Sequence, residues 1–246
     1  MRSKLLMFVA VATMTMTPAA HADFMFTEDF TGPTLNPNFE ATNDFGGYSI
    51  DGTIGNLSNS ERQYIRTVDS DYRNFDFRLT LNHDFFVSND IAFVGIGNGS
   101  PDGAFSNEPG FGSLMFRFHN PALAGGQIDL AFWESGNDFF EGGLGNITST
   151  NEPARVGIRR VGDLLTLSFD TDFNGTFTPD VVRSFDLSES QYAALKTSLD
   201  AETRLFFGST FGTRFDDFVV TQGVPEPTTG LIAAVVFATT LLKRRR

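Results

Sequence analysis

The chain has 246 residues, no cysteine and a formal net charge of −12. An acidic surface repels phosphate backbones, which argues against nucleic acid as a partner. Without disulfides or thiolate metal ligands, a domain of this size must depend on a large apolar core.

The first 22 residues have the order of a secretory signal peptide. Arg2 and Lys4 precede a short apolar run, and Ala20 and Ala22 form a small-residue site at its end. These three features are typical of such signals, so cleavage after Ala22 is expected. An uncleaved N-terminal anchor is the alternative, and the shortness of the apolar run argues against it.

Residues 23–224 contain short strand patterns separated by Gly, Asn, Asp and Pro clusters. The segment 75–81 alternates strictly, with Phe75, Phe77, Leu79 and Leu81 on one face. Similar patterns predict strands at 91–96, 113–118, 128–133, 154–159, 164–169, 204–207 and 215–221. Many short strands without alternating helices predict a single all-β domain, a β-sandwich or jelly roll.

One short helix is expected near residue 190. The segment 188–191 fits a capping box, and Tyr192, Leu195 and Leu199 recur at helical spacing. A lone helix among strands normally covers a sheet edge or a connection, so we assign it no function.

The segment that follows strand 164–169 has two interpretations. Oxygen-bearing side chains alternate there before Gly175, namely Asp170, Asp172 and Asn174. This is the first half of an EF-hand-like calcium loop, but Val181 stands where a bidentate Glu is expected and Asp180 precedes it by one. Asn174-Gly175 also predicts a tight hairpin between 164–169 and 176–185 without any ion.

Few residues are suited to catalysis. Glu134 and Glu141 are the first candidates for a carboxylate pair, but a turn is expected between them, so no shared strand fixes their separation. His83 and His119 are the two histidines that follow the signal segment, and a zinc site would need both of them and carboxylates as well. A surface pair of glutamates and two strand-end histidines is the simpler interpretation.

The C-terminal segment 225–246 has the features of an anchor. Pro225-Glu226-Pro227 precedes an uncharged stretch, 228–242, and then a basic cluster that begins at Lys243. As a transmembrane helix this stretch would be about 22 Å long, short for a resident span but adequate for a transient one. The terminal cations would stay cytoplasmic, which places the domain outside. An ordinary tail anchor is the alternative.

This arrangement resembles the PEP-CTERM sorting signal of Gram-negative bacteria. The resemblance implies an N-terminal signal peptide and processing near Pro225, Glu226 and Pro227 by an exosortase. It also implies an association with exopolysaccharide and the outer surface. The protein would then be exported, held in the membrane through 228–242, and finally located at the cell surface or in the extracellular matrix.

Two segments resemble the ends of concanavalin A-like lectin/glucanase domains. Glu28–Phe39 is similar to the opening of those domains, and Phe215–Thr221 is similar to the closing strand. The resemblance implies a jelly roll whose terminal strands are neighbours in one sheet. It also suggests a structural calcium held by Asp217 beside Glu28–Thr31. The Glu-x-Asp-x-x-Glu motif of the glucanases is absent from this chain.

The sequence therefore predicts a non-catalytic surface or matrix protein, with structural calcium as an open question. Polysaccharide binding is the activity that the resemblance suggests. The alternative is an extracellular polysaccharide-degrading glycoside hydrolase that uses Glu134 and Glu141.

Overall fold

The computed structural model describes residues 26–41, 48–56, 63–83, 91–98, 113–119, 126–133, 139–147, 153–209 and 213–222. The signal segment with Ala20 and Ala22, the Pro225–Pro227 triplet and the expected helix 228–242 lie outside these ranges. Within them, no helix has the length and apolar character needed to cross a membrane.

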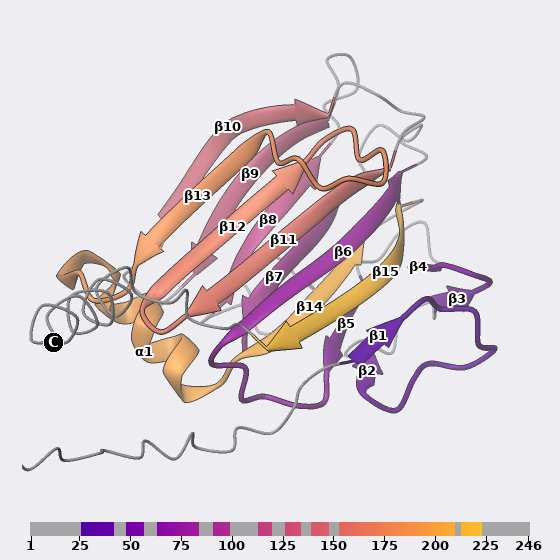
Figure 1. Ribbon diagram of the computed structural model, residues 1–246, viewed down its shortest axis with the longest axis horizontal. Helices are drawn as coiled ribbons and strands as arrows, with labels where there is room; N and C mark the ends of the chain where they lie inside the picture. The colour runs from indigo at the N-terminus through magenta and orange to yellow at the C-terminus, as the bar shows by residue number, and fades with distance from the viewer. Residues whose placement is uncertain are drawn as a thin grey trace, which may run out of the picture.

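Two antiparallel sheets lie one in front of the other (Figure 1). Sheet A contains, in spatial order, β13 (Val181–Asp186), β12 (Leu164–Asp170), β11 (Ala154–Val161), β6 (Phe75–His83), β15 (Thr213–Gln222), β4 (Ile54–Asn56) and β3 (Tyr48–Ile50), with β1 (Phe26–Glu28) also paired to β15. Sheet B contains β10 (Phe139–Ile147), β9 (Gly126–Trp133), β8 (Ser113–His119), β7 (Ile91–Gly97), β14 (Arg204–Ser209), β5 (Gln63–Thr67) and β2 (Phe39–Ala41). The expected all-β sandwich is confirmed.

The core fills the space between the sheets with large apolar side chains. On β6, the alternation predicted from the sequence is confirmed, because Phe75, Phe77, Leu79 and Leu81 are all buried. Phenylalanines bridge the two layers, as where the Phe118 ring lies 4.8 Å from the Phe169 ring. Each such side chain contributes about 1.5–3 kcal/mol through burial, so the sandwich needs no disulfide.

The two terminal strands of the described chain are neighbours, as the concanavalin A-like resemblance implied. Phe26 of β1 pairs with Val220 of β15, and the Phe26 ring stacks on Phe218 at 5.1 Å. β4 pairs with the other end of the same edge of β15, through Arg214 and Phe215. The long interior strand β15, at the end of the described chain, thus pairs with both β1 and β4 from its beginning.

The expected helix is present, but its capping box is not. A 3₁₀ turn, η1 (Ser190–Tyr192), leads into α1 (Ala193–Ala201), and the Leu195 and Leu199 side chains are buried as predicted. The Ser188 hydroxyl donates to the Asp186 carboxylate at 2.6 Å. It therefore caps the end of β13 rather than the helix, whose N-terminus has no side-chain cap.

The predicted hairpin is present, but a tight turn at Asn174-Gly175 does not form it. β12 and β13 do pair, but they are joined by a ten-residue segment, 171–180, that folds over the outer face of sheet A. A Cβ atom at Gly157 would lie 2.9 Å from the Phe177 ring, so that ring packs directly on the backbone of β11. The Arg78 guanidinium lies 4.8 Å from the centre of the same ring. These contacts account for the longer connection, because a two-residue turn would leave Phe177 in water.

Candidate functional site

The outer face of sheet B carries an apolar cluster that is separate from the core. Its members are Tyr64, Phe93, Met115 and Phe206, each no more than 1% exposed, and we call them the apolar bed. The Tyr64 ring lies 6.2 Å from Phe93 and 6.4 Å from Phe206, edge to face. An outer sheet face normally meets water, so burial of four large side chains distinguishes this surface.

Strand register explains how the apolar bed forms. Phe206, Gly95 and Met115 are consecutive cross-strand partners on β14, β7 and β8. A Cβ atom at Gly95 would lie 2.6 Å from both the Phe206 ring and the Met115 Cβ. The missing side chain at this position therefore lets the Phe206 ring lie across β7.

Buried polar groups border the apolar bed. Asp129 of β9 is 1% exposed, accepts the Gly143 backbone N–H at 2.9 Å, and is the cross-strand partner of Arg117. Ser113 stands two positions before Met115 on the same side of β8 and is completely buried. Its hydroxyl has no hydrogen-bond partner among the residues that the structure describes. Leaving such a group unpaired costs about 1–3 kcal/mol, which points to a water molecule or a ligand at this position.

Of the two carboxylates suspected of catalysis, Glu141 lies within the described residues. Glu141 of β10 accepts three hydrogen bonds from Arg183 of β13, at 2.8, 3.0 and 3.2 Å, so it closes the sandwich edge as an ion pair. Glu134 lies outside the described residues, and His83 and His119 are the last residues of β6 and β8. Along β9, positions 127, 129 and 131 share one side by register, and Asp129 is the single carboxylate residue among them. A two-carboxylate site for glycoside hydrolysis would need a second one at about 5–9.5 Å.

Three carboxylates gather at the neck of the 171–180 segment. Asp170, Asp172 and Asp180 each offer an oxygen, and these oxygens all lie within 4.8 Å of one another. Asp170 is fully buried and accepts the Thr178 backbone N–H at 2.7 Å. Asp180 accepts both the hydroxyl and the N–H of Thr171, at 2.6 and 3.0 Å, and these bonds lower its pKa. The sequence placed Asp170 and Asp172 in this group, whereas Asp180 had counted only as a departure from the EF-hand pattern.

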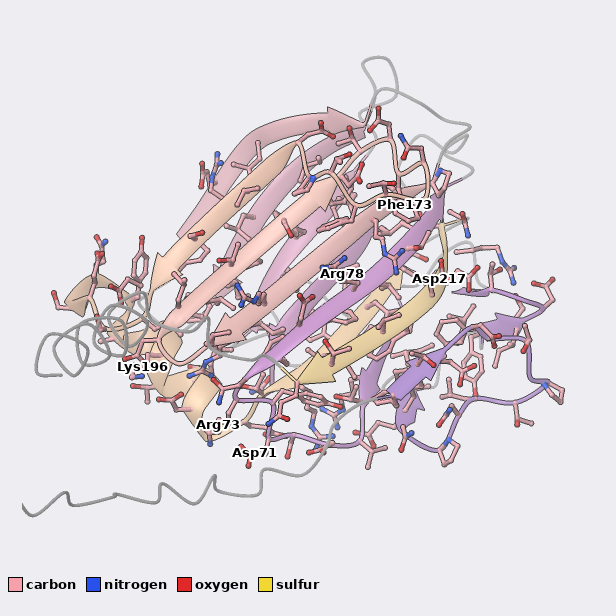
Figure 2. The ribbon with its side chains drawn as sticks, viewed as in Figure 1. Asp71, Arg73, Arg78, Phe173, Lys196 and Asp217 are labelled. Atoms are coloured by element: carbon pink, nitrogen blue, oxygen red, sulfur yellow. The ribbon has the colours of Figure 1, made fainter. Side chains whose placement is uncertain are left out.

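The other two expected calcium ligands are placed differently. The Asn174 side-chain oxygen accepts the Thr176 N–H at 3.3 Å and so serves its own turn. Asp217 lies in the bulge of β15 with φ +48°, where it accepts the Thr80 hydroxyl at 3.2 Å. The segment Glu28–Thr31 does lie beside it as expected, because Glu28 pairs with Phe218, and the Glu28 carboxylate accepts the Phe30 N–H at 2.8 Å. Asp217 therefore does not belong to the described three-carboxylate group, although it faces the same side of sheet A as Phe173 and Arg78 (Figure 2).

An arginine lies next to this carboxylate group. Arg155 of β11 is the cross-strand partner of Asp170, and its guanidinium lies 4.7 Å from the centre of the Phe173 ring. Burial lowers the pKa of Arg155, while the charges of Asp217 and Asp170 act in the opposite direction. A fixed positive charge beside Asp170 would compete with any cation bound there.

No family model matches the sequence, and no curated protein matches it. Solved structures with a similar fold have concanavalin A-like lectin or glycosidase-type folds. The Emp47p carbohydrate recognition domain has a TM-score of 0.50 at 12% identity, over 80% of this chain and 93% of that one. A pseudo β-1,3-glucanase and immunostimulatory antigen of Mycobacterium tuberculosis has a TM-score of 0.53 at 8% identity, over 81% and 98%.

A xylan β-1,4-xylosidase from Bacillus halodurans C-125 has a TM-score of 0.56 at 11% identity, over 80% of this chain but 39% of that chain. At such low identities, these TM-scores show a similar fold and nothing more specific. The similar structures include a carbohydrate recognition domain as well as an enzyme, so the fold is compatible with more than one function.

Proposed function

We propose that this protein is an exported, non-catalytic polysaccharide-binding protein, and that its ligand binds at the outer face of sheet B. An apolar surface with a few convergent polar groups is the usual composition of a ligand site. The apolar bed, bordered by Asp129, Arg117 and Ser113, has this composition. The similarity in fold to a carbohydrate recognition domain supports the proposal.

The unpartnered Ser113 hydroxyl is the observation that carries the proposal. A sugar hydroxyl both donates and accepts hydrogen bonds, so it can pair with Ser113 whichever way that side chain turns. Asp129 is an acceptor on the next strand and Arg117 a donor on the same strand. The apolar bed, at most 1% exposed, would support these polar groups from beneath and would not itself touch the sugar.

The test is calorimetric titration of the intact protein with a panel of neutral and acidic polysaccharides, repeated with Ser113→Ala. We expect the variant to bind the polysaccharide about 5- to 10-fold more weakly, the equivalent of one hydrogen bond. Its melting temperature should stay constant or rise, because the variant removes a buried hydroxyl that has no partner in the free protein. A variant that bound as tightly as the original protein would contradict the proposed site.

Ser168→Ala is the matched control. The Ser168 hydroxyl donates to the Gly157 carbonyl at 3.1 Å on sheet A, so its loss should lower stability and leave binding unchanged. If the protein hydrolysed a polysaccharide, and Glu141→Gln abolished this hydrolysis, the function would be glycoside hydrolysis and not binding alone.

The location that we propose rests on the two ends of the sequence. Cleavage after Ala22, exosortase processing at Pro225-Glu226-Pro227 and membrane retention through 228–242 would bring the domain to the cell surface. Mass spectrometry of the mature protein tests this proposal. An N-terminus at Met1, or a C-terminus that still includes Arg246 after surface delivery, would contradict it.

We also propose that Asp170, Asp172 and Asp180 hold one structural calcium ion. Carboxylate oxygens are the preferred ligands of calcium, and the three are already close together in the fold. The ion would fix the neck of the 171–180 segment, and Arg155 would weaken its affinity.

A further inference from the structure

The 171–180 segment has an exposed tip that is held on both sides. Residues 174–176 are exposed, whereas Phe173 and Phe177 on either side of them are half-buried. The Phe173 ring, labelled in Figure 2, lies 4.7 Å from the Arg155 guanidinium, measured to the ring centre. The Phe177 ring packs on the backbone of β11. The tip is therefore anchored by two aromatic side chains and open to water between them.

Asn174 and Gly175 form an Asn-Gly pair whose second backbone nitrogen is accessible. A glycine after an asparagine leaves this nitrogen unhindered, because glycine has no Cβ. At Gly175, where φ is +97°, a Cβ would meet no atom of the described residues within 4 Å, its chain neighbours aside. The Gly175 N–H also makes no hydrogen bond with the part of the chain that the structure describes. The nitrogen can therefore be reached by the side chain that precedes it.

A hydrogen bond holds the Asn174 side chain against the main chain of this turn. Its Oδ1 accepts the Thr176 N–H at 3.3 Å, so the side chain reaches across Gly175. This bond brings the amide carbon Cγ toward the Gly175 nitrogen, which lies between the two bonded groups in the chain. The donor also withdraws electrons from Cγ and would stabilise negative charge on Oδ1, as the donors of an oxyanion hole do. An electrophilic carbon and an accessible nitrogen thus share one small turn.

We propose that Asn174 modifies itself, and that its side-chain amide becomes a carboxylate. The Gly175 nitrogen loses its proton to water and attacks Cγ, which is held beside it. The Cγ–Nδ2 bond then breaks as Nδ2 takes up a proton, so that ammonia leaves and a succinimide ring remains. Water opens this ring at either carbonyl, which gives aspartate in the original chain or isoaspartate with the chain running through Cγ. One water enters, one ammonia leaves, and nothing is oxidised or reduced.

The new carboxylate would lie close to the proposed calcium site. Position 174 follows Asp170 and Asp172 at alternate positions, and two residues span at most about 7 Å. This is shorter than the screening length of about 10 Å at moderate salt, so the added charge would attract a cation at the site. We therefore expect the aspartate form to bind calcium about 2- to 5-fold more tightly. This consequence rests on the proposed calcium site, whereas the conversion itself does not.

Peptide mapping by mass spectrometry tests the conversion. The freshly purified intact protein is kept at neutral pH for several weeks, and the peptide that contains residues 171–180 is compared before and after. We expect this peptide to gain the mass difference between an amide and a carboxylic acid, and to separate into an aspartyl and an isoaspartyl form. The sequence has a second Asn-Gly pair, Asn98-Gly99, which trypsin places in a different peptide. Asn174 that stays an amide in the folded protein would overturn the inference.

Asn174→Gln is the matched control. Glutamine retains an amide at the same position, but attack by the Gly175 nitrogen would have to close a larger ring and fix one more torsion. Its conversion should be at least about 10-fold slower, because the reacting atoms are no longer held together. A mass change in residues 171–180 that continued at the full rate in this variant would also overturn the inference, since the reaction would then not be at Asn174.

Calcium titration of Asn174→Asp separates the conversion from its consequence. This variant has the aspartate product from the start, and it should bind calcium about 2- to 5-fold more tightly than Asn174→Gln. If Asn174 converts and the two variants have equal calcium affinity, the self-modification stands and its effect on calcium is rejected. If Asn174 converts and neither variant binds calcium, the proposed calcium site fails and the self-modification still stands.

Discussion

The pKa values of individual carboxyl groups in this protein are shifted in opposite directions by their surroundings. The Thr171 hydrogen bonds stabilise the charged form of Asp180 and lower its pKa. Burial raises the pKa of Asp216, and the neighbouring charges of Asp217 and Asp29 add to this effect. Charge on Asp180 therefore favours the folded state, whereas charge on Asp216 opposes it.

The first prediction concerns the dependence of stability on pH. A carboxyl group whose pKa is raised by folding contributes stability at low pH, and this contribution is lost as the pH rises through its folded pKa. Asp216→Asn should therefore raise the melting temperature at pH 7, on the order of 1–3 °C, and change it little at pH 3. Asparagine retains the oxygen that accepts the Asp217 N–H.

Asp180→Asn is the matched control, and it has the opposite sign. A lowered pKa contributes stability that is present at neutral pH and lost as the pH falls through the folded pKa. This variant should be less stable than the original protein at pH 7 and nearly equal to it at low pH. Melting temperatures of both variants are measured at pH 7 and at pH 3. If both variants changed the melting temperature in the same direction at pH 7, the opposite pKa shifts of Asp216 and Asp180 would be contradicted.

The second prediction concerns calcium. Removal of divalent ions by chelation should lower the melting temperature, and added calcium should restore it, if the ion binds Asp170, Asp172 and Asp180. Asp172→Asn should abolish the calcium response while leaving the metal-free melting temperature unchanged, since Asp172 is exposed. Calcium stabilisation that persists in this variant would place the ion elsewhere.

The candidate site was only partly predictable from its residues. Alternating oxygen side chains identified Asp170 and Asp172, because their spacing is local in the sequence. Asp180 joins them through the path of the whole 171–180 segment, which depends on Phe177 packing over Gly157. The Ser113 and Asp129 site depends on the register between β8 and β9, which no local spacing encodes.

At the scale of elements, α1 is fixed to the end of sheet A by charged groups. Asp200 near the helix C-terminus pairs with the Arg160 guanidinium, and also with Arg73 at 3.3 Å and Lys196 at 3.4 Å. The Arg160 side chain is 4% exposed, so it relies on Asp200 for much of its compensation. Arg73 and Lys196 lie near the same end of the sandwich in Figure 2.

The third prediction follows from this buried cation. Asp200→Ala should lower the free energy of unfolding by about 2–3 kcal/mol, because it leaves the Arg160 charge buried without its carboxylate. Asp163→Ala is the control, since it removes a pair with Lys196 in which both side chains are more than one-third exposed, and should cost less than about 1 kcal/mol. Urea denaturation measures both values. If both variants lost the same free energy of unfolding, the burial of Arg160 would not explain the destabilisation caused by Asp200→Ala.

Clear alternation, more than length, decided which strands the sequence revealed, because the nine-residue β10, which contains Gly142 and Gly143, was not predicted. In β6, β11 and β12, which have seven residues or more, apolar and polar side chains alternate along most of the strand, so this periodicity was sufficient to predict the strands. β3 and β4 have three residues each and show no usable period. The prediction of a tight turn at Asn174-Gly175 was wrong, although β12 and β13 do pair, because side-chain packing on sheet A outweighed a strong local turn preference.

At the scale of the whole molecule, acidic residues outnumber basic ones, 30 to 18. Described ion pairs such as Arg183 with Glu141 and Arg66 with Glu40 each use one charge of either sign, so they leave this excess unchanged. The remaining like charges repel one another more in the folded protein than in the expanded chain.

The fourth prediction is that added salt stabilises the protein. Raising sodium chloride from 20 to 300 mM should raise the melting temperature, because it shortens the range of repulsion to below about 10 Å. The same series in Asp216→Asn should show a smaller rise. A fall with salt would mean that attraction within the ion pairs outweighs the repulsion of the net charge.

The position of β15 also determines how the domain would bear mechanical load. The described chain ends with this interior strand, at Gln222, which pairs with Phe75 of β6. If the segment after Gln222 is tethered, as proposed, tension acts along β15 and perpendicular to its hydrogen bonds with β6. The bonds would then share the force in shear instead of breaking one after another. The bulge between Asp216 and Val219 divides this ladder into two stretches, so rupture would proceed in two blocks, while the three-residue pairing of β1 bears little of the pull.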